Sequence, residues 1–399
     1  MNIAIAQSGG PTAAINSSLC GVFDEAEKYN EIGRIYGSLN GIEGILNDNL
    51  IDLKEVLITE NDKQLLKRTP STVLGSCRFK LKNSSDDDSD YKRITQTFAK
   101  YDIKAFFYIG GNDSMDTVMK LDSYFRENHI DIKVVGVPKT IDNDLPLTDH
   151  TPGFGSAAKY VATTLQEIIR DSRVYSIPSV TIVEIMGRDA GWLTASSCVL
   201  RANGEPAPHL IYLPESDFSE EHYLEDVKRI SERYKAVIVA VSEGIDCLAS
   251  RSEATDAFGH KYLSGVGKYL EELTRDHMGC KVRSIELNVM QRCGSHIASL
   301  TDLDEAWRIG AAAVNEALKC GSGVMMGFRR ISNNPYRVGI APLDVRECAN
   351  KAKYFPKEWI TPEGNNVTID ALNYFLPLIQ GEPKIDYRNG IPVHFRLDQ

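Results

Sequence analysis

The feature that most constrains the fold is an apolar run that ends abruptly in a polar loop. Residues 134–137 read Val-Val-Gly-Val, a run typical of a parallel strand buried on both faces. Pro138 ends this strand, because proline has no N–H for the sheet. The polar residues that follow within six positions are Lys139, Thr140, Asp142 and Asp144. In an open α/β sheet, such a loop faces the ligand crevice at the carboxyl ends of the strands.

These four residue types suit phosphoryl transfer. The lysine can neutralise phosphate oxygens, one carboxylate can take a proton from an attacking hydroxyl, and the other can hold Mg²⁺. The alternative is an ordinary polar turn in which Asp142 and Asp144 are solvated or cap a helix. The rest of the chain has to decide between the two interpretations.

Length and charge set the class of protein. A chain of 399 residues predicts two domains, and 42% hydrophobic with 25% charged residues is typical of a globular protein. The net charge of −10 argues against a nucleic-acid partner and against an anionic membrane surface. It leaves room for a small anionic substrate, because a local cluster of lysines and arginines can dominate one cleft.

The cysteines and the N-terminus predict a cytoplasmic location. Eight scattered cysteines show no CxxC pair and no Cys/His metal spacing, so a zinc site is not expected and a reducing compartment is favoured. Residues 1–7 lack a basic region and a long apolar core, which predicts a first strand and no signal peptide. No apolar run reaches the roughly 20 residues that span a bilayer.

Two glycine pairs lie at predicted strand-to-helix junctions. The strand 2–7 runs into Gly9-Gly10, and the strand 105–109 runs into Gly110-Gly111. Free N–H groups and a helix dipole make such junctions natural anion cradles, although a single pair of this kind more often marks a tight turn. Residues 75–80 add glycine, Arg78 and Lys80, which form either a basic phosphate clamp or an exposed loop.

Strands and helices alternate throughout, which predicts an α/β fold. A crossing to a second lobe is expected at residues 151–156, and Trp192 is expected in a core. The further expected elements are strands at 180–186, 209–213 and 236–241, helices at 157–170, 220–234, 264–278 and 369–376, a polar stretch at 251–260, and a hairpin of 323–328 with 336–340.

Seven motifs in this order resemble the 6-phosphofructokinase family, over residues 3 to about 330. The motifs are Ser-Gly-Gly (8–10), Gly-Ser-Cys-Arg (75–78), Gly-Gly-Asn-Asp-Ser (110–114), Pro-Lys-Thr-Ile-Asp-Asn-Asp (138–144), Met-Gly-Arg (186–188), Ser-Glu-Gly (242–244) and Gln-Arg (291–292). The resemblance implies two doubly wound, Rossmann-like lobes with the active site in the cleft between them. It implies a phosphoryl-donor lobe of residues 1–153 plus about 293–341, and a sugar-phosphate lobe of 154–292 plus about 342–399. It also implies a homodimer or homotetramer.

The resemblance implies roles for individual residues. On the phosphoryl-donor side would lie Gly10, Arg78, Lys80, Gly111, Asn112, Asp113 and Ser114. Around fructose 6-phosphate would lie Thr140, Asp144, Met186, Gly187, Arg188, Glu243, Arg283 and Arg292. Asp142 would be the base for the sugar 1-hydroxyl, a role that typically contributes about 10²–10⁴-fold. Arg283 and Arg292 would clamp the 6-phosphate. Mg²⁺ is the expected cofactor, near Asn112, Asp113 and Asp144.

Two positions indicate the donor. ATP-using members typically have glycine where this chain has Asp113 and Lys139, whereas pyrophosphate-using members have Asp and Lys. A carboxylate at Asp113 would stand where a nucleotide α-phosphate must go, and like charges about 4 Å apart repel by several kcal/mol at a dielectric constant near 20. The chain therefore resembles the pyrophosphate-dependent type, which makes fructose 1,6-bisphosphate and phosphate reversibly.

Three positions depart from the family pattern and keep alternatives open. Asn112 stands where many members have aspartate, Ser179 where many have arginine, and Val289 where a histidine or tyrosine is usual. Metal binding and the identity of the sugar are thereby uncertain, and sedoheptulose 7-phosphate is a second candidate acceptor. The remaining alternatives are an ATP-dependent member, a non-catalytic regulatory paralogue, and the more distant NAD kinase or lipid kinase branch.

Overall fold

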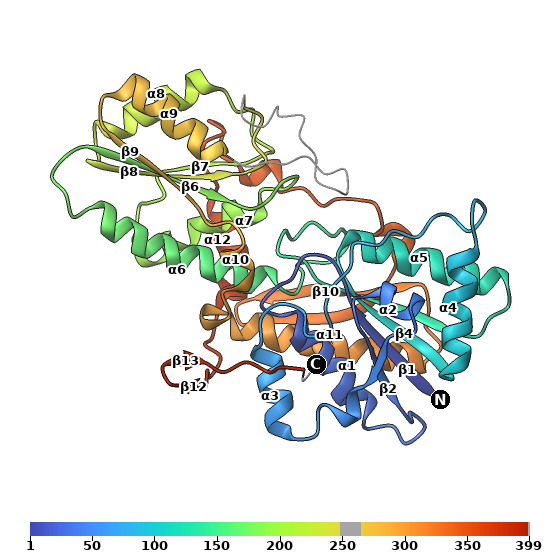
Figure 1. The fold of residues 1–399 in the computed structure, drawn as a ribbon. Coiled ribbons are helices and arrows are strands. Elements are labelled where there is room, and N and C mark those ends of the chain that lie inside the picture. The colour runs from blue at the N-terminus through green and yellow to red at the C-terminus, as the bar shows by residue number, and fades with distance from the viewer. Residues whose placement is uncertain (248–264, 398–399) are drawn as a thin grey trace.

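The chain forms two lobes, each built on a mainly parallel β-sheet (Figure 1). The computed structural model describes residues 1–247 and 265–397. The polar stretch expected at 251–260, and the expected helix start at Ser264, lie outside these residues. Among the described residues, no helix has both the length and the apolar character needed to cross a membrane.

The larger sheet has seven strands in the order β11-β10-β5-β4-β1-β2-β3. The five central strands run parallel, and β3 and β11 pair antiparallel at the two edges. The strands are β1 (Asn2–Gln7), β2 (Ile35–Ser38), β3 (Leu50–Asp52), β4 (Ile103–Gly110), β5 (Lys133–Pro138), β10 (Val324–Asn333) and β11 (Tyr336–Asp344). The predicted buried strand at 134–137 is therefore confirmed as β5, and the predicted hairpin as β10 and β11.

Helices cover both faces of the large sheet, which explains why its strands read as continuous apolar runs. Ile3 and Ile5 face the layer of α1 (Ile15–Ala26) and α11 (Leu300–Leu318). Ala4 and Ala6 face the opposite layer of α4 (Ser89–Lys100) and α5 (Asn112–Glu127). The shorter helices of this lobe are α2 (Ile42–Leu46) and α3 (Glu60–Arg68).

The smaller sheet is wholly parallel, in the order β7-β8-β6-β9. Its strands are β6 (Ser179–Ile185), β7 (Leu210–Tyr212), β8 (Ala236–Ser242) and β9 (Lys281–Glu286). One face packs against α6 (Phe154–Ser172), α7 (Trp192–Ala195) and α12 (Ile369–Phe375), and the other against α8 (Glu220–Ser231) and α9 (Val266–Met278). Trp192 is 4% exposed inside this core, as predicted.

The chain passes between the lobes several times. It enters the second lobe through α6, returns through α10 (Met290–Cys293) and α11, and leaves again after β11 towards α12. The terminal hairpin of β12 (Tyr387–Arg388) and β13 (Ile391–Pro392) leads to Phe395 and Leu397, which pack on the core of the large-sheet lobe. The division into lobes at residues 153, 292 and 341 stays a prediction. Phe395 and Leu397 belong to the segment that this prediction assigns to the sugar-phosphate lobe, but they lie against the large-sheet lobe.

Two glycines allow α1 and α11 to approach closely. A Cβ on Gly21 would lie 2.0 Å from the backbone oxygen of Trp307, and one on Gly310 would lie 2.2 Å from that of Ser18. Backbone atoms of packed helices move little, so a methyl group at either position forces the helices apart. Because α1 follows the Gly9-Gly10 turn, this contact also holds the start of α1 in place.

We expect Gly21→Ala to lower the free energy of unfolding by roughly 1–2 kcal/mol, because overpacking exceeds the helix-propensity gain of about 1 kcal/mol. Chemical denaturation measures the change. Gly267→Ala in α9 is the control, since its nearest contact would be a side-chain oxygen of Glu184 at 3.2 Å. A Gly21→Ala variant as stable as the parent protein would contradict the prediction.

Candidate active site

The predicted site loops that follow β1, β4 and β5 meet at the point where the strand order of the large sheet reverses. From β1 the chain proceeds to β2 on one side, whereas from β4 it proceeds to β5 on the other. Ligands of open α/β sheets bind at such a switch point, outside the carboxyl ends of the strands. Here those ends carry Ser8-Gly9-Gly10 after β1, Gly111 after β4 and Lys139 after β5.

The loop at residues 75–78 lies against the first glycine turn. The Ser76 hydroxyl donates a hydrogen bond to the Gly9 carbonyl (2.7 Å), and the Ser8 hydroxyl donates to the Cys77 carbonyl (3.1 Å). Gly9 and Gly75 have φ angles of 76° and 75°, in the left-handed region that favours glycine. Arg78 and Lys80 are exposed beyond this contact. The structure thus brings the 75–80 segment to the glycine turn.

Lys139 is a buried charge at the centre of the site. The residue is only 2% exposed, and its ammonium donates a hydrogen bond to the Gly10 carbonyl (2.5 Å). A Cβ on Gly9 would lie 3.3 Å from this ammonium, so glycine keeps the approach open. Burial, with a contribution from Arg292, lowers the pKa of Lys139 to about 8, against the opposing effects of Asp142 and Asp144.

At the start of α5, one predicted site residue is exposed to solvent, whereas the two others are engaged in hydrogen bonds or buried. The Asp113 carboxylate is exposed, and the Lys80 ammonium lies 3.9 Å from it, so these two form an exposed ion pair. Asn112 is already engaged: its amide oxygen accepts from the Asn350 N–H (2.5 Å), and its amide nitrogen donates to the Lys351 carbonyl (2.6 Å). Ser114 is buried, where its hydroxyl would lie 1.9 Å from a Cβ on Gly110.

Three carboxyl groups have raised pKa values. Burial first, and then the charge of Glu243, raise the pKa of Asp142 to about 6. Burial and the charge of Asp142 raise the pKa of Asp144 to about 7. Burial raises the pKa of Glu243 to about 7, although the Gly187 N–H and Arg188 act in the opposite direction. The cluster therefore carries uncompensated negative charge, the condition in which a carboxylate takes up a proton near neutral pH.

We call residues 139–149 the catalytic loop, because the predicted base Asp142 lies in it. The Thr140 side chain fixes the start of this loop. Its hydroxyl accepts the Asp142 N–H (3.1 Å) and lies 3.4 Å from the Asp142 carboxylate. Its backbone forms a bridge with Gly153, and its carbonyl accepts the Thr151 hydroxyl (2.9 Å). This local network holds the Asp142 carboxylate close to Lys139.

The Met186–Arg188 loop follows β6 and faces Glu243, which follows β8. The Met186 N–H donates to Gln291 (3.3 Å), and the Gly187 N–H donates to Glu243 (3.4 Å). Gly187 has φ 134° and its carbonyl accepts the Ser242 hydroxyl (2.5 Å). Among the described residues, the buried Nε of Arg188 has no hydrogen-bond partner, so a donor remains for an anionic ligand.

Arg292 and Arg283 lie in different places. The Arg292 guanidinium would be 3.5 Å from a Cβ on Gly10, so it lies beside the first glycine turn. Arg283 instead forms an ion pair with Asp171 (3.0 Å), so this chain alone does not place it in the carboxylate cluster. Ser179 is buried at the start of β6, and Val289 is 48% exposed before α10.

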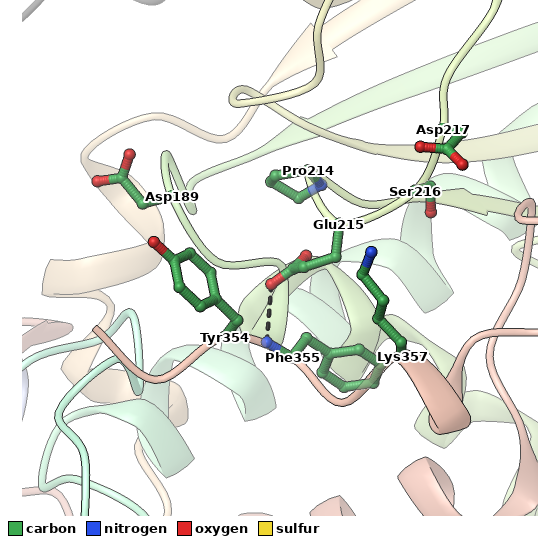
Figure 2. Close-up of a pocket in the computed structure, with 8 residues that line it drawn as sticks. All are labelled: Asp189, Pro214, Glu215, Ser216, Asp217, Tyr354, Phe355 and Lys357. Carbon is green, nitrogen blue, oxygen red and sulfur yellow. Dashed lines mark hydrogen bonds between the residues drawn. The ribbon is translucent and has the colours of Figure 1, made fainter. Parts of the chain in front are cut away.

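The sequence argument missed Asp189, which directly follows the Met-Gly-Arg motif. Its charge contributes to the raised pKa values of Asp142, Asp144 and Glu243. Asp189 also lines a cavity of 360 Å³ together with Glu215 and Tyr354 (Figure 2). Its position immediately after a recognised motif was the available signal.

Fold and site together define a two-lobed α/β protein in which glycine turns and basic groups face a cluster of carboxyl groups. The family model described as "Phosphofructokinase" matches residues 2–317. The chain therefore belongs to the phosphofructokinase family.

Individual relatives agree with this family. The chain is 37% identical to the pyrophosphate--fructose 6-phosphate 1-phosphotransferase of Halomonas elongata, over 99% of this chain and 96% of the relative. It is 32% identical to a sulfofructose kinase of Alkalicoccus urumqiensis, over 86% of this chain. The solved structure of a pyrophosphate-dependent phosphofructokinase from Marinobacter aquaeolei matches with a TM-score of 0.88 at 38% identity, covering 100% of this chain and 96% of that one.

We expect Asp144→Asn to raise the free energy of unfolding at pH 8 by on the order of 1 kcal/mol. The folded pKa, about 7, lies above the reference value of 3.8, so ionisation in the folded state is costly. The gain should be full above about pH 7 and should fade as the pH falls towards 4. Chemical denaturation across this range measures it. The exposed Asp276→Asn is the control, and unchanged stability of Asp144→Asn at pH 8 would refute the prediction.

Proposed function

We propose that this protein transfers a phosphoryl group reversibly between pyrophosphate and the 1-hydroxyl of fructose 6-phosphate. The observation that carries the proposal is Lys139, buried between the Gly10 carbonyl and the Asp142 loop. A positive charge at this point lies between the donor loops and the carboxylate that would receive the proton. The names of the Halomonas elongata and Marinobacter aquaeolei proteins support the same donor and acceptor.

The proposed step needs one base and several positive charges. Asp142 removes the proton of the sugar 1-hydroxyl as its oxygen attacks the terminal phosphorus of pyrophosphate. The bridging P–O bond breaks, and inorganic phosphate leaves while fructose 1,6-bisphosphate forms. Lys139, with Arg78 and Lys80 from the donor side, neutralises charge that develops on the phosphate oxygens. The reverse step uses the protonated Asp142 as the acid.

On the sugar side, the residues bind and orient. Glu243 accepts hydrogen bonds from sugar hydroxyls, and the backbone of Met186 and Gly187 shapes the pocket. Arg188 and Arg292 supply guanidinium groups for the sugar phosphate, where a planar fork suits a set of oxygens. Arg283 completes the phosphate clamp in an assembly of subunits. We therefore infer a homodimer or homotetramer. From the scattered cysteines we also infer that the protein works in the cytoplasm.

The carboxyl groups of the site fit a Mg²⁺ ion whose other ligands come from the phosphates of the substrate. The charge of Asp142 raises the pKa of Asp144, and a bound cation would relieve this repulsion. No group of three His, Cys, Asp or Glu side chains suited to a metal occurs in residues 1–247 and 265–397. Mg²⁺ typically uses one or two carboxylates plus substrate phosphates and water. Asp144 and Asp113 would hold it, with Asn112 less available, and the bound ion would screen the phosphate charges.

The donor assay tests the proposal directly. With fructose 6-phosphate and Mg²⁺, we expect fructose 1,6-bisphosphate from pyrophosphate and none from ATP, because Asp113 repels a nucleotide α-phosphate. Asp113→Gly should admit ATP, and Asp142→Asn should lower kcat by about 10²-fold or more. Turnover with ATP alone would overturn the proposed donor. Turnover only with sedoheptulose 7-phosphate would overturn the proposed acceptor.

The pH dependence of kcat/KM for pyrophosphate should be bell-shaped. It should rise through about pH 6 as Asp142 and the carboxyl groups coupled to it lose protons, because the base must be ionised. It should fall above about pH 8 as Lys139 loses its charge. Lys139→Arg, which stays charged, should lack the alkaline fall whatever its rate. Steady-state kinetics from pH 5 to 9 checks this, and an alkaline fall retained in Lys139→Arg would assign it to another group.

A further inference from the structure

A segment that follows β11 contacts both lobes and the catalytic loop. We call residues 350–355 the strap. At its first end, the Asn350 N–H donates to the Asn112 side chain, whose amide donates back to the Lys351 carbonyl (2.5 and 2.6 Å). In its middle, the Lys353 N–H donates to the Asp144 carbonyl (2.7 Å). The strap therefore joins the start of α5 to the catalytic loop.

The other end of the strap contacts the second lobe. The Trp192 indole N–H donates to the Lys353 carbonyl (2.9 Å), and Trp192 begins α7 just after the Met186–Arg188 loop. The Phe355 N–H donates to Glu215 (2.8 Å), the bond drawn in Figure 2. One short segment thus connects the three loops to which donor, base and acceptor are assigned.

The ammonium of Lys353 has all three of its donors used within the catalytic loop. It donates to the Asn143 side-chain oxygen (3.2 Å), the Thr148 carbonyl (3.1 Å) and the Asp149 carbonyl (2.9 Å). An ammonium has three donors and no acceptor, so this set satisfies it fully. It also lies 4.9 Å from the centre of the Trp192 ring, a favourable cation–π distance.

Asn143 lies between Asp142 and Asp144, and its conformation determines how the side chains of these two aspartates are oriented. It is fully buried and has φ 55°, a left-handed conformation that asparagine tolerates better than most residues. Its amide nitrogen donates to the Tyr374 hydroxyl (3.0 Å), while its oxygen accepts from Lys353. The side chain is thus held from both ends, which fixes the turn between Asp142 and Asp144.

We propose that Lys353 is a positioning residue, which acts through Asn143 to hold the Asp142 carboxylate in its reactive place. This inference rests on the proposed function for its kinetic consequence, but its structural consequence is independent of it. The Lys353 ammonium contacts backbone and amide oxygens of the loop and donates to none of the donor-loop residues. A displacement of about 1 Å in a reacting group can cost about 10²-fold in rate, so the effect should appear in kcat.

The first test replaces Lys353 with methionine. We expect kcat with pyrophosphate to fall by about 10- to 100-fold, with each KM changed by less than about threefold. Lys351→Met is the matched control, because among the described residues its ammonium pairs with Glu347 on the surface (2.8 Å) and with no loop residue. Lys353→Arg, which keeps the charge, should recover part of kcat and also covers the case in which the methionine variant fails to fold.

The second test asks whether Lys353 acts through Asn143. Asn143→Gly keeps the left-handed backbone but removes the clamped side chain. If the two residues act as one unit, the double variant with Lys353→Met should lose no more kcat than the worse single variant. Losses that multiply would overturn the proposed route through Asn143.

The third test does not depend on activity. Hydrogen exchange of the amides of residues 140–149 should be faster by about 10-fold in Lys353→Met and unchanged in Lys351→Met. Absence of pyrophosphate turnover in the parent protein would refute the proposed function and leave this test valid. Unchanged exchange in Lys353→Met, or a rise in KM with unchanged kcat, would overturn the positioning role.

Discussion

The buried charge of Lys139 is the constraint on which the rest of the site depends. A lysine 2% exposed has lost most of its hydration, and its pKa of about 8 records that cost. The structure offsets the loss with the Gly10 carbonyl and with the negative charge of Asp142 and Asp144. Those carboxyl groups are themselves poorly compensated, with pKa values of about 6 and 7. The positive charge of Lys139 and the negative charges of Asp142 and Asp144 therefore stabilise each other. An anionic phosphoryl donor with its bound cation would add further compensating charge to both.

The sequence was most informative where local chemistry alone decides the structure. The run at 134–137 became β5, since a short continuous apolar segment ended by Pro138 is typical of a buried strand. The glycine pairs did lie at the ends of β1 and β4, because tight turns and close approaches require glycine. The motifs supplied the candidate site residues, and the parallel sheet explains why loops so distant in sequence meet at one edge.

The sequence was least informative where long-range contacts decide. Nothing near Lys353 signals a contact with Asn143, which is 210 residues away. The left-handed turn at Asn143 depends on that contact and on Tyr374, so neither composition nor periodicity could predict it. Arg283 shows the opposite problem, since the family resemblance implies a phosphate ligand but within one chain it pairs with Asp171. Such pairings emerge only when segments distant in sequence are packed together.

The strap also bears on how two lobes can share one reaction. An inter-domain contact is ordinarily soft, and relative motion is the default expectation. Here one segment hydrogen-bonds to the start of α5, to the Asp144 carbonyl and to Trp192, so the three sites cannot shift independently without breaking specific bonds. In a reaction whose rate depends on charge placement, a common support of this kind keeps the reacting groups at fixed relative positions. The position of the catalytic loop therefore depends on both lobes, because the segment that supports it crosses from one lobe to the other.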